Sequence, residues 1–158
     1  MPTTATSASL PELTPEDSVG LQRALCTVEH LMTKEMVTLA PNQSVGEAMA
    51  LFGARRFRHV PVKDGDTLVG VLSDRDLLRF LARRGAGVEE TVASIMSRNP
   101  VTITAGASVS EATNMITHHR INCLPVVNET GALVGILTTT DLLRALYAVQ
   151  LWIERRLS

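Results

Sequence analysis

The sequence predicts an α+β protein in which two copies of a β-α-β-β-α unit pack about a pseudo-two-fold axis, with an extra N-terminal helix and an extended C-terminal helix. Three observations support this prediction. The chain repeats itself once, and both copies have the same order of helix and strand signals. Hydrophobic residues make up 45% of the 158 residues, which is a normal share for a folded protein.

The internal repeat aligns Val28–Arg79 with Val92–Arg144 at an offset of 64 residues, which becomes 65 after one extra residue near Gly131. Identical stretches occur in the same order in both copies, namely Val37-Thr38 with Val101-Thr102, Pro61-Val62 with Pro125-Val126, and Asp76–Arg79 with Asp141–Arg144. The chain therefore divides into a tail that we expect to be disordered (1–13), an N-terminal helix (14–27), a first repeat (28–84), a second repeat (92–147) and a helical extension (148–158).

The first part of each copy is predicted to be a short apolar strand followed by a helix. The strands are Met36–Leu39 and Val101–Ile103, and each leads through Pro or Gly to the helix. A capping box marks the start of both helices. The capping pairs are Ser44 with Glu47 and Ser108 with Glu111.

The second part of each copy is predicted to be a hairpin followed by another helix. In the first copy the strands are Arg58–Val62 and Leu68–Leu72, joined by the turn Lys63–Asp66. The helix begins near Asp74, and its apolar residues are Leu77, Leu78 and Leu81. A unit of about 55 residues buries little core alone. We therefore expect the two copies to pack face to face, with two related clefts between them that are lined by strand ends and helix N-termini.

Two segments outside the repeats also have helix signals. Thr14 followed by Pro15 is a strong helix start, with Thr as N-cap and Pro at the first helical position. The last helix continues past the second repeat with large apolar residues that have no partner in the two copies: Tyr147, Leu151, Trp152 and Ile153. We expect these residues to form an inter-subunit surface of a homodimer.

Composition excludes several classes of function. The 15 basic and 16 acidic residues give a net charge of −1, which is not the charge of a nucleic-acid or anionic-membrane binder. Aromatic residues make up 3%, too few for base stacking. No apolar run approaches the roughly 18 residues of a membrane span. With two cysteines and no signal peptide, we expect a soluble cytoplasmic protein with reduced thiols.

The two copies resemble the cystathionine-β-synthase (CBS) domain, and the tandem is similar to a stand-alone CBS pair, or Bateman module. The resemblance covers roughly Val28–Tyr147. It rests on the steps Val60-Pro61-Val62 and Leu124-Pro125-Val126 and on the stretches Gly70–Asp76 and Gly135–Asp141. It implies a non-catalytic sensor that binds an adenine nucleotide (AMP, ADP or ATP) between the copies as a regulatory ligand. The sensor would signal to a separate target protein through a change in conformation or dimer packing, and it would require no cofactor.

The resemblance assigns the ribose hydroxyls to Asp76 and Asp141, each the last residue of a Ser/Thr-x-x-Asp motif. An ionised Asp has two acceptor oxygens, which match a vicinal diol, and a helix N-terminus favours phosphate. Ser73 with Asp76 and Thr138 with Asp141 are also ordinary capping boxes. Both roles are compatible, because the hydroxyl caps the helix while the carboxylate faces the cleft.

All but two of the basic residues are arginine, whose planar fork matches phosphate. His119-Arg120 resembles the His-Arg pair with which the γ subunit of AMP-activated kinase contacts nucleotide phosphates. The first copy has Arg55-Arg56 at this place, followed by Arg58-His59. A solvated basic helix end is the alternative interpretation. The first set is the more basic one and predicts a polyphosphate site, whereas the second cleft would take a monophosphate, another ligand or none.

The expected ligand-binding residues come from equivalent places in both copies. Thr38 and Thr102 join the set because they follow the first strands, where the family presents backbone to adenine. The full set is Thr38, Arg55, Arg56, Arg58, His59, Ser73, Asp76, Thr102, His119, Arg120, Asn122, Thr138 and Asp141.

The sequence has four other interpretations. S-adenosylmethionine, NAD or a cyclic dinucleotide fits the same clefts, and a ligand-free structural or protein-interaction module is a second hypothesis. Metal binding is disfavoured because the neighbours His118 and His119 point about 100° apart on a helix. Catalysis is disfavoured because Cys123 falls in an expected core strand and the chain has neither a nucleophile-elbow nor a P-loop motif.

Overall fold

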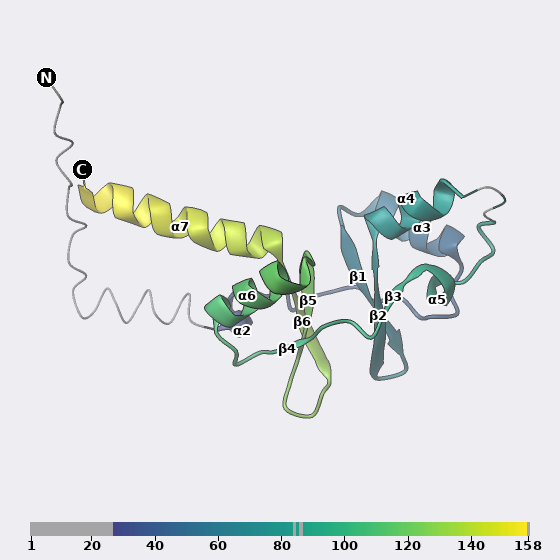
Figure 1. Ribbon diagram of the computed structural model, residues 1–158, viewed down its shortest axis with the longest axis horizontal. Helices are drawn as coiled ribbons and strands as arrows, with labels where there is room; N and C mark the ends of the chain where they lie inside the picture. Colours follow the sequence, from purple (N-terminus) through teal and green to yellow (C-terminus); the bar gives the residue numbers. More distant parts are fainter. Residues whose placement is uncertain (1–26, 84, 86, 158) are drawn as a thin grey trace, which may run out of the picture.

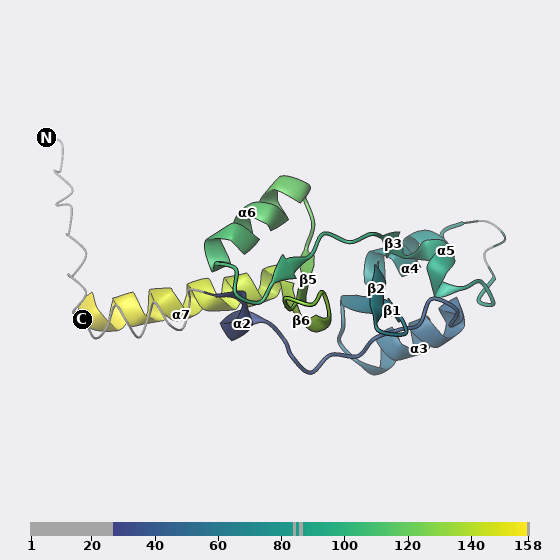
Figure 2. The ribbon, with the colours of Figure 1, turned by 90° about the horizontal axis from the view of Figure 1, so that it is seen from below.

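The computed structural model describes residues 27–83, 85 and 87–157, which form two halves that lie side by side along the long axis of the molecule (Figures 1 and 2). The first half contains α3 (Val45–Ala54), β1 (His59–Asp64), β2 (Thr67–Ser73), α4 (Asp74–Leu81), α5 (Val92–Ile95) and β3 (Ser97–Arg98). The second half contains α2 (Val28–Leu31), β4 (Ile103–Thr104), α6 (Val109–His119), β5 (Cys123–Val127), β6 (Leu133–Thr138) and α7 (Thr139–Leu157). The expected tail and N-terminal helix, 1–13 and 14–27, fall outside the described residues except for Thr27.

Each half is built on an antiparallel hairpin with the same register. In the first half β1 pairs with β2 from His59 opposite Ser73, and in the second half β5 pairs with β6 from Cys123 opposite Thr138. Both hairpins contain a register shift near the end of the first strand. The predicted hairpins are therefore present, with β1 and β2 extended to Asp64 and Thr67 at the turn.

The beginning of each repeat joins the half that the other repeat forms. Thr33, in the first repeat, pairs with Ile136 of β6, and Ser97, its counterpart in the second repeat, pairs with Val71 of β2. The short helices are exchanged in the same way, since α2 contacts β6 and α7 while α5 contacts β2 and α4. The periodicity of the sequence did not indicate this exchange.

The exchange changes the predicted first strands. Of Met36–Leu39, only Leu39 pairs with a strand, in a parallel bridge to Val62, because the residues before it form the crossing between the halves. The strand expected at Val101–Ile103 begins at Ile103 as β4 and runs parallel to β5. Both predicted strands are thus shorter than the apolar runs suggested.

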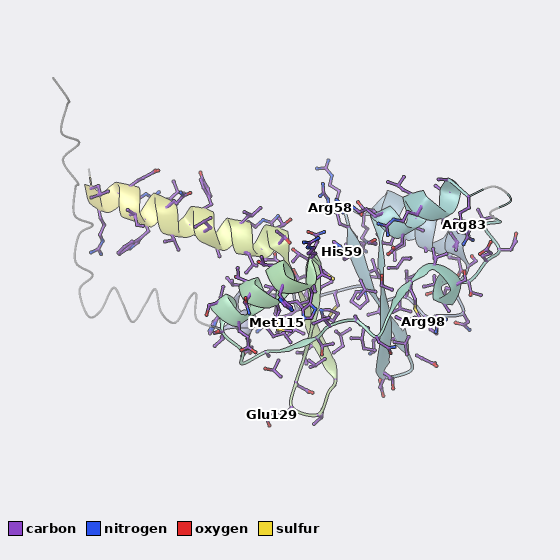
Figure 3. The ribbon with its side chains drawn as sticks, viewed as in Figure 1. Arg58, His59, Arg83, Arg98, Met115 and Glu129 are labelled. Atoms are coloured by element: carbon purple, nitrogen blue, oxygen red, sulfur yellow. The ribbon has the colours of Figure 1, made fainter. Side chains whose placement is uncertain are left out.

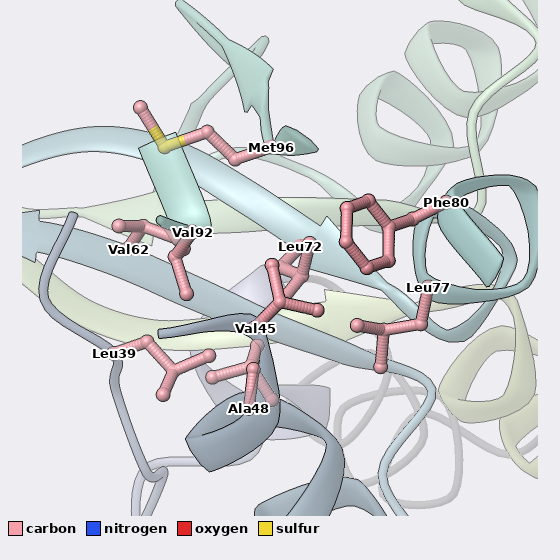
Figure 4. Packing of buried hydrophobic residues seen from close by; sticks show 10 residues of the cluster. Leu39, Val45, Ala48, Val62, Leu72, Leu77, Phe80, Val92 and Met96 are labelled. Atoms are coloured by element: carbon pink, nitrogen blue, oxygen red, sulfur yellow. The ribbon is translucent and has the colours of Figure 1, made fainter. Parts of the chain in front are cut away.

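Each half has its own hydrophobic core, and each core includes one valine from the exchanged segment. In the first half, helices α3 and α4 pack Val45, Ala48 and Phe80 against the strands, and fully buried Val92 completes the cluster (Figure 4). The core of the second half contains Val28, which is also fully buried. A smaller cluster of Val71, Cys123 and Ile136 joins the two sheets. Cys123 is therefore the buried hydrophobe that its position predicted.

The helix starts agree with the predicted capping residues. Ser44 and Glu47 form a reciprocal box on α3, and Ser73 and Asp76 form another on α4. On α6 the cap is one-sided: the Ser108 hydroxyl accepts the N–H of Glu111 at 3.0 Å, but the Ser108 N–H does not donate to the Glu111 carboxylate.

Helix α7 continues beyond the second half, away from both sheets (Figures 1 and 2). Leu146, Tyr147 and Leu157 are more than half exposed on it. No helix in the described part of the chain is long and apolar enough to cross a membrane.

The exchanged segments make Gly70 of β2 sensitive to substitution. A Cβ atom there would lie 2.5 Å from Met96 Sδ and 2.9 Å from the Ser97 carbonyl oxygen. We expect Gly70→Ala to lower the free energy of unfolding by about 1–3 kcal/mol in urea denaturation. Gly53→Ala is the control, because nothing lies within 4 Å of its Cβ in α3, and it should raise stability by up to about 1 kcal/mol. An equal change in the free energy of unfolding for Gly70→Ala and Gly53→Ala would contradict the close approach of β2 and β3.

Candidate functional site

A cavity of about 660 Å³ lies between the two halves, and both repeats contribute to its walls. The first repeat supplies the crossing segment (Thr33, Glu35, Met36, Val37), the loop into β1 (Arg56, Phe57, Arg58, His59, Pro61) and the start of α4 (Asp74, Arg75). The second repeat supplies Asn122 before β5, Ile136 and Thr138 of β6, and the start of α7 (Thr139, Thr140, Asp141, Leu143, Arg144). Figure 3 shows Arg58 and His59 where the halves meet.

Part of the wall is apolar. Met36 and Val37 come from the crossing segment, Pro61 from β1 and Ile136 from β6. Met36 also packs against the cluster that joins the two sheets, so this part of the wall is fixed by the contact between the halves. The face of a flat ring can pack against such a surface.

Asp141 presents a partly engaged carboxylate to the cavity. Its Oδ2 accepts the Thr138 N–H at 2.8 Å and the Thr138 hydroxyl at 2.9 Å, while Oδ1 lies 3.8 Å from Arg144 Nη1. The side chain is 11% exposed. Capping therefore holds the carboxylate in place through one oxygen, and the other remains able to accept hydrogen bonds from a ligand.

The equivalent carboxylate of the first repeat has nearly the same contacts. Asp76 Oδ2 accepts the Ser73 N–H at 2.9 Å and the Ser73 hydroxyl at 2.7 Å, and Oδ1 lies 3.8 Å from Arg79. Neither Ser73 nor Asp76 lines the cavity. The cavity thus combines the basic loop of the first repeat with the carboxylate of the second.

The cavity contains more cationic side chains than the acidic ones can pair. Four arginines and three carboxylates line it. Within the described residues, the guanidinium groups of Arg56, Arg58 and Arg75 form neither an ion pair nor a hydrogen bond. Asp74 accepts the backbone N–H of Arg75 at 2.9 Å. Unpaired guanidinium groups around one cavity are suited to a ligand with a phosphate.

His59 is half-buried at the start of β1. Burial lowers the pKa of its imidazole below the usual value of 6.5, against the opposing effect of the nearby Asp74 and Asp76 carboxylates. At its counterpart in the second repeat, burial raises the pKa of the Cys123 thiol to about 12, so that side chain stays neutral. The two repeats therefore differ chemically at this place, as the sequence predicted.

The structure brings together six of the expected site residues. Those that line the cavity are Arg56, Arg58, His59, Asn122, Thr138 and Asp141. Those that do not are Thr38, Arg55, Ser73, Asp76, Thr102, His119 and Arg120. Val37, the neighbour of Thr38, lines the cavity, but Thr38 itself does not. Thr102 lies at a second, shallower hollow of about 440 Å³ near the hairpin turns.

Sequence reasoning missed the residues at the helix starts. Asp74 and Arg75 lie inside the Ser73-x-x-Asp76 motif, and Thr139 and Thr140 lie inside its second copy. They were missed because the motif specifies only its first and last residues. Glu35 was missed because it lies in the crossing segment, whose path the sequence does not give. Among the described residues, no group of three His, Cys, Asp or Glu side chains is placed to hold a metal ion.

Comparison with known proteins identifies the same two repeats. The model of the CBS domain matches residues 28–83 and again residues 92–148. The CBS domain-containing protein YhcV of Bacillus subtilis is 30% identical over 118 residues, which cover 75% of this chain and 84% of YhcV. Inosine-5′-monophosphate dehydrogenase of Korarchaeum cryptofilum is 31% identical over 126 residues, which cover 80% of this chain but 25% of the enzyme. The chain thus spans about a quarter of that enzyme's length.

Two solved structures are similar over most of the chain. The structure of CBSX2 in complex with AMP has a TM-score of 0.71 and 28% identity, and the match covers 79% of this chain and 98% of CBSX2. The CBS domain pair of protein MJ0100, in complex with 5′-methylthioadenosine and S-adenosyl-L-methionine, has a TM-score of 0.71 and 27% identity over 80% of this chain and 98% of that one.

The burial of His59 makes stability depend on pH. Because the folded chain holds this imidazole neutral below pH 6.5 while the unfolded chain protonates it, stability is lost as pH falls through 6.5. We expect His59→Gln to reduce the drop in melting temperature between pH 7.5 and pH 5.5 (roughly the window around the usual histidine pKa). His118→Gln, at an exposed histidine of α6, is the control. A drop of the same size in wild type and His59→Gln would contradict the role of burial.

Proposed function

The chain belongs to the CBS domain family, and from this premise we propose that it is a non-catalytic regulatory module that binds an adenine nucleotide in the cavity between its repeats. One observation carries the proposal: the cavity combines an apolar wall, the available Oδ1 of Asp141 and three unpaired arginines. These are the groups that a purine, a ribose diol and a phosphate require.

The arrangement supports a single orientation of the nucleotide. The adenine would contact Met36 and Ile136, the ribose hydroxyls would donate to Asp141, and the phosphates would reach Arg58 and Arg75. The CBSX2 and MJ0100 complexes hold adenosine compounds in similar CBS pairs, which supports the class of ligand. The unpaired arginines favour a phosphate over the positively charged sulfonium of S-adenosylmethionine.

A nucleotide in this cavity would contact both repeats and could regulate how they pack. A ligand shifts an equilibrium only by its difference in affinity for the two states. At 100 times its dissociation constant, a ligand that binds one state stabilises that state by about 2.7 kcal/mol. The matched dehydrogenase contains this region as a quarter of its length, and its activity is not proposed for this chain. The expected cytoplasmic location stays a prediction.

The exposed faces of α4 and α7 favour a second part of the proposal, a homodimer. Leu78 on α4 and its counterpart Leu143 on α7 are 65% and 60% exposed, and Leu146 and Tyr147 continue the face. Large apolar side chains gathered on two helices mark a protein-interaction surface. A ligand-free interaction module would use the same face. The nucleotide-binding measurements below distinguish it from a nucleotide-binding module.

We predict that purified protein binds ADP and that Asp141→Asn weakens binding about tenfold to a hundredfold in isothermal titration calorimetry, because a charged acceptor for the ribose hydroxyls is lost. Glu47→Gln is the control, since Glu47 forms an equivalent capping box on α3 outside the cavity. If AMP, ADP and ATP all fail to bind the wild type, the proposed function is wrong. Unchanged affinity in Asp141→Asn would instead contradict the assignment of the ribose site.

We also predict that Leu146→Glu converts a dimer to a monomer in light scattering after size exclusion, because it places a charge in the apolar α7 face. Val88→Glu changes another half-exposed apolar residue, in the loop before α5, and should leave the dimer intact. A wild-type protein that is monomeric at every concentration tested would rule out the homodimer.

A further inference from the structure

Two structurally equivalent corners face the same cavity. The first corner consists of Arg58, Asp74 and Arg75, and the second consists of their counterparts in the repeat, Asn122, Thr139 and Thr140. The backbone holds both in the same way. The Asp74 N–H donates to the Arg58 carbonyl at 3.0 Å, and the Thr139 N–H donates to the Asn122 carbonyl at 3.0 Å. The cavity therefore extends across the pseudo-two-fold axis.

The pseudo-two-fold axis exchanges the two corners. A ligand beside Asp76 would therefore direct its phosphates to the second corner, as the proposed nucleotide beside Asp141 directs its phosphates to the first, because both carboxylates are held by the same capping contacts. The two equivalent positions in the chain therefore differ in the corner that their phosphates would meet.

Of the two corners, only the first has cationic side chains, since Arg144, the arginine that the second repeat contributes to the cavity, is paired with Asp141. Arg58 and Arg75 stand where the second repeat has the uncharged Asn122 and Thr140. Within the described chain neither guanidinium has a partner, so one phosphate chain can engage both. A second phosphate chain at the second corner would meet the uncharged Asn122 and Thr140 and the negative charge of the first ligand.

We propose that each chain holds one anionic adenine nucleotide at a time, beside Asp141, because only that position faces a corner with an arginine pair, Arg58 and Arg75. This inference rests on the proposed function and adds the stoichiometry and the residues that impose it. Other residues that line the cavity also favour a ligand beside Asp141 over one beside Asp76. Arg56 and His59 belong to its cavity, whereas Arg120, the counterpart of Arg56, does not line the cavity and the counterpart of His59 is the buried Cys123.

Calorimetric titration with ADP tests the stoichiometry. We expect one ADP per chain, a loss of affinity of about tenfold or more in Asp141→Asn, and less than about a threefold loss in Asp76→Asn. The two variants are matched, because both carboxylates cap a helix through one oxygen and lie 3.8 Å from an arginine through the other. Two ADP per chain, or an equal loss in Asp76→Asn, would overturn the inference. A wild type that binds neither ADP nor adenosine would overturn the proposed function itself.

A second experiment exchanges the chemistry of the corners. The double variant Arg58→Asn, Arg75→Thr gives the first corner the residues of the second. It should lose roughly a hundredfold in ADP affinity while its affinity for adenosine changes less than about threefold, since adenosine has no phosphate. The reverse variant Asn122→Arg, Thr140→Arg provides a second pair and should raise the stoichiometry of ADP to two. Equal losses of affinity for ADP and adenosine in the first variant, or one ADP per chain in the second, would contradict the role of Arg58 and Arg75.

Discussion

The structure depends on a reciprocal exchange in which the first residues of each repeat complete the core of the other half. Val28 is buried among residues of α6, β5 and β6, and Val92 is buried among residues of α3, β1 and β2. Each exchanged segment also adds a strand contact, to β6 through Thr33 and to β2 through Ser97. Neither half can keep a complete core without the other, because each lacks a buried side chain and an edge contact when its partner is removed.

The same exchange produces the cavity. The chain that leaves α2 crosses from the second half to the first and forms a wall with Glu35, Met36 and Val37 on its way to Leu39. This crossing fixes the relative position of the sheets, so the loop before β1 faces the start of α7 and not only its own helix α4. The carboxylate of one repeat therefore lies in one cavity with the arginines of the other, and a ligand there would contact both halves.

Symmetry in the backbone is combined with asymmetry in the side chains. The hairpin registers, the capping contacts of Asp76 and Asp141 and the anchoring of the two corners are nearly identical. The groups at equivalent places are not, since Arg58 corresponds to Asn122 and His59 to Cys123. Backbone geometry is set by turn, cap and core residues that both repeats retain, whereas exposed polar residues of the cavity, such as Arg58 and Asn122, are free to differ because they contribute little to either core.

The sequence by itself determined the repeat, the two hairpins and the starts of α3, α4 and α6, because these depend on neighbours a few residues apart. It also identified Asp141 and the basic loop of the first repeat as candidate site residues. Only the tertiary structure decided which core Val28 and Val92 enter, because equivalent valines in two equivalent repeats fit either core equally well by periodicity. For the same reason the sequence could not decide that Arg58 lies with Asp141 and not with Asp76: a repeat alignment specifies counterparts, but the path of the crossing segments decides contacts.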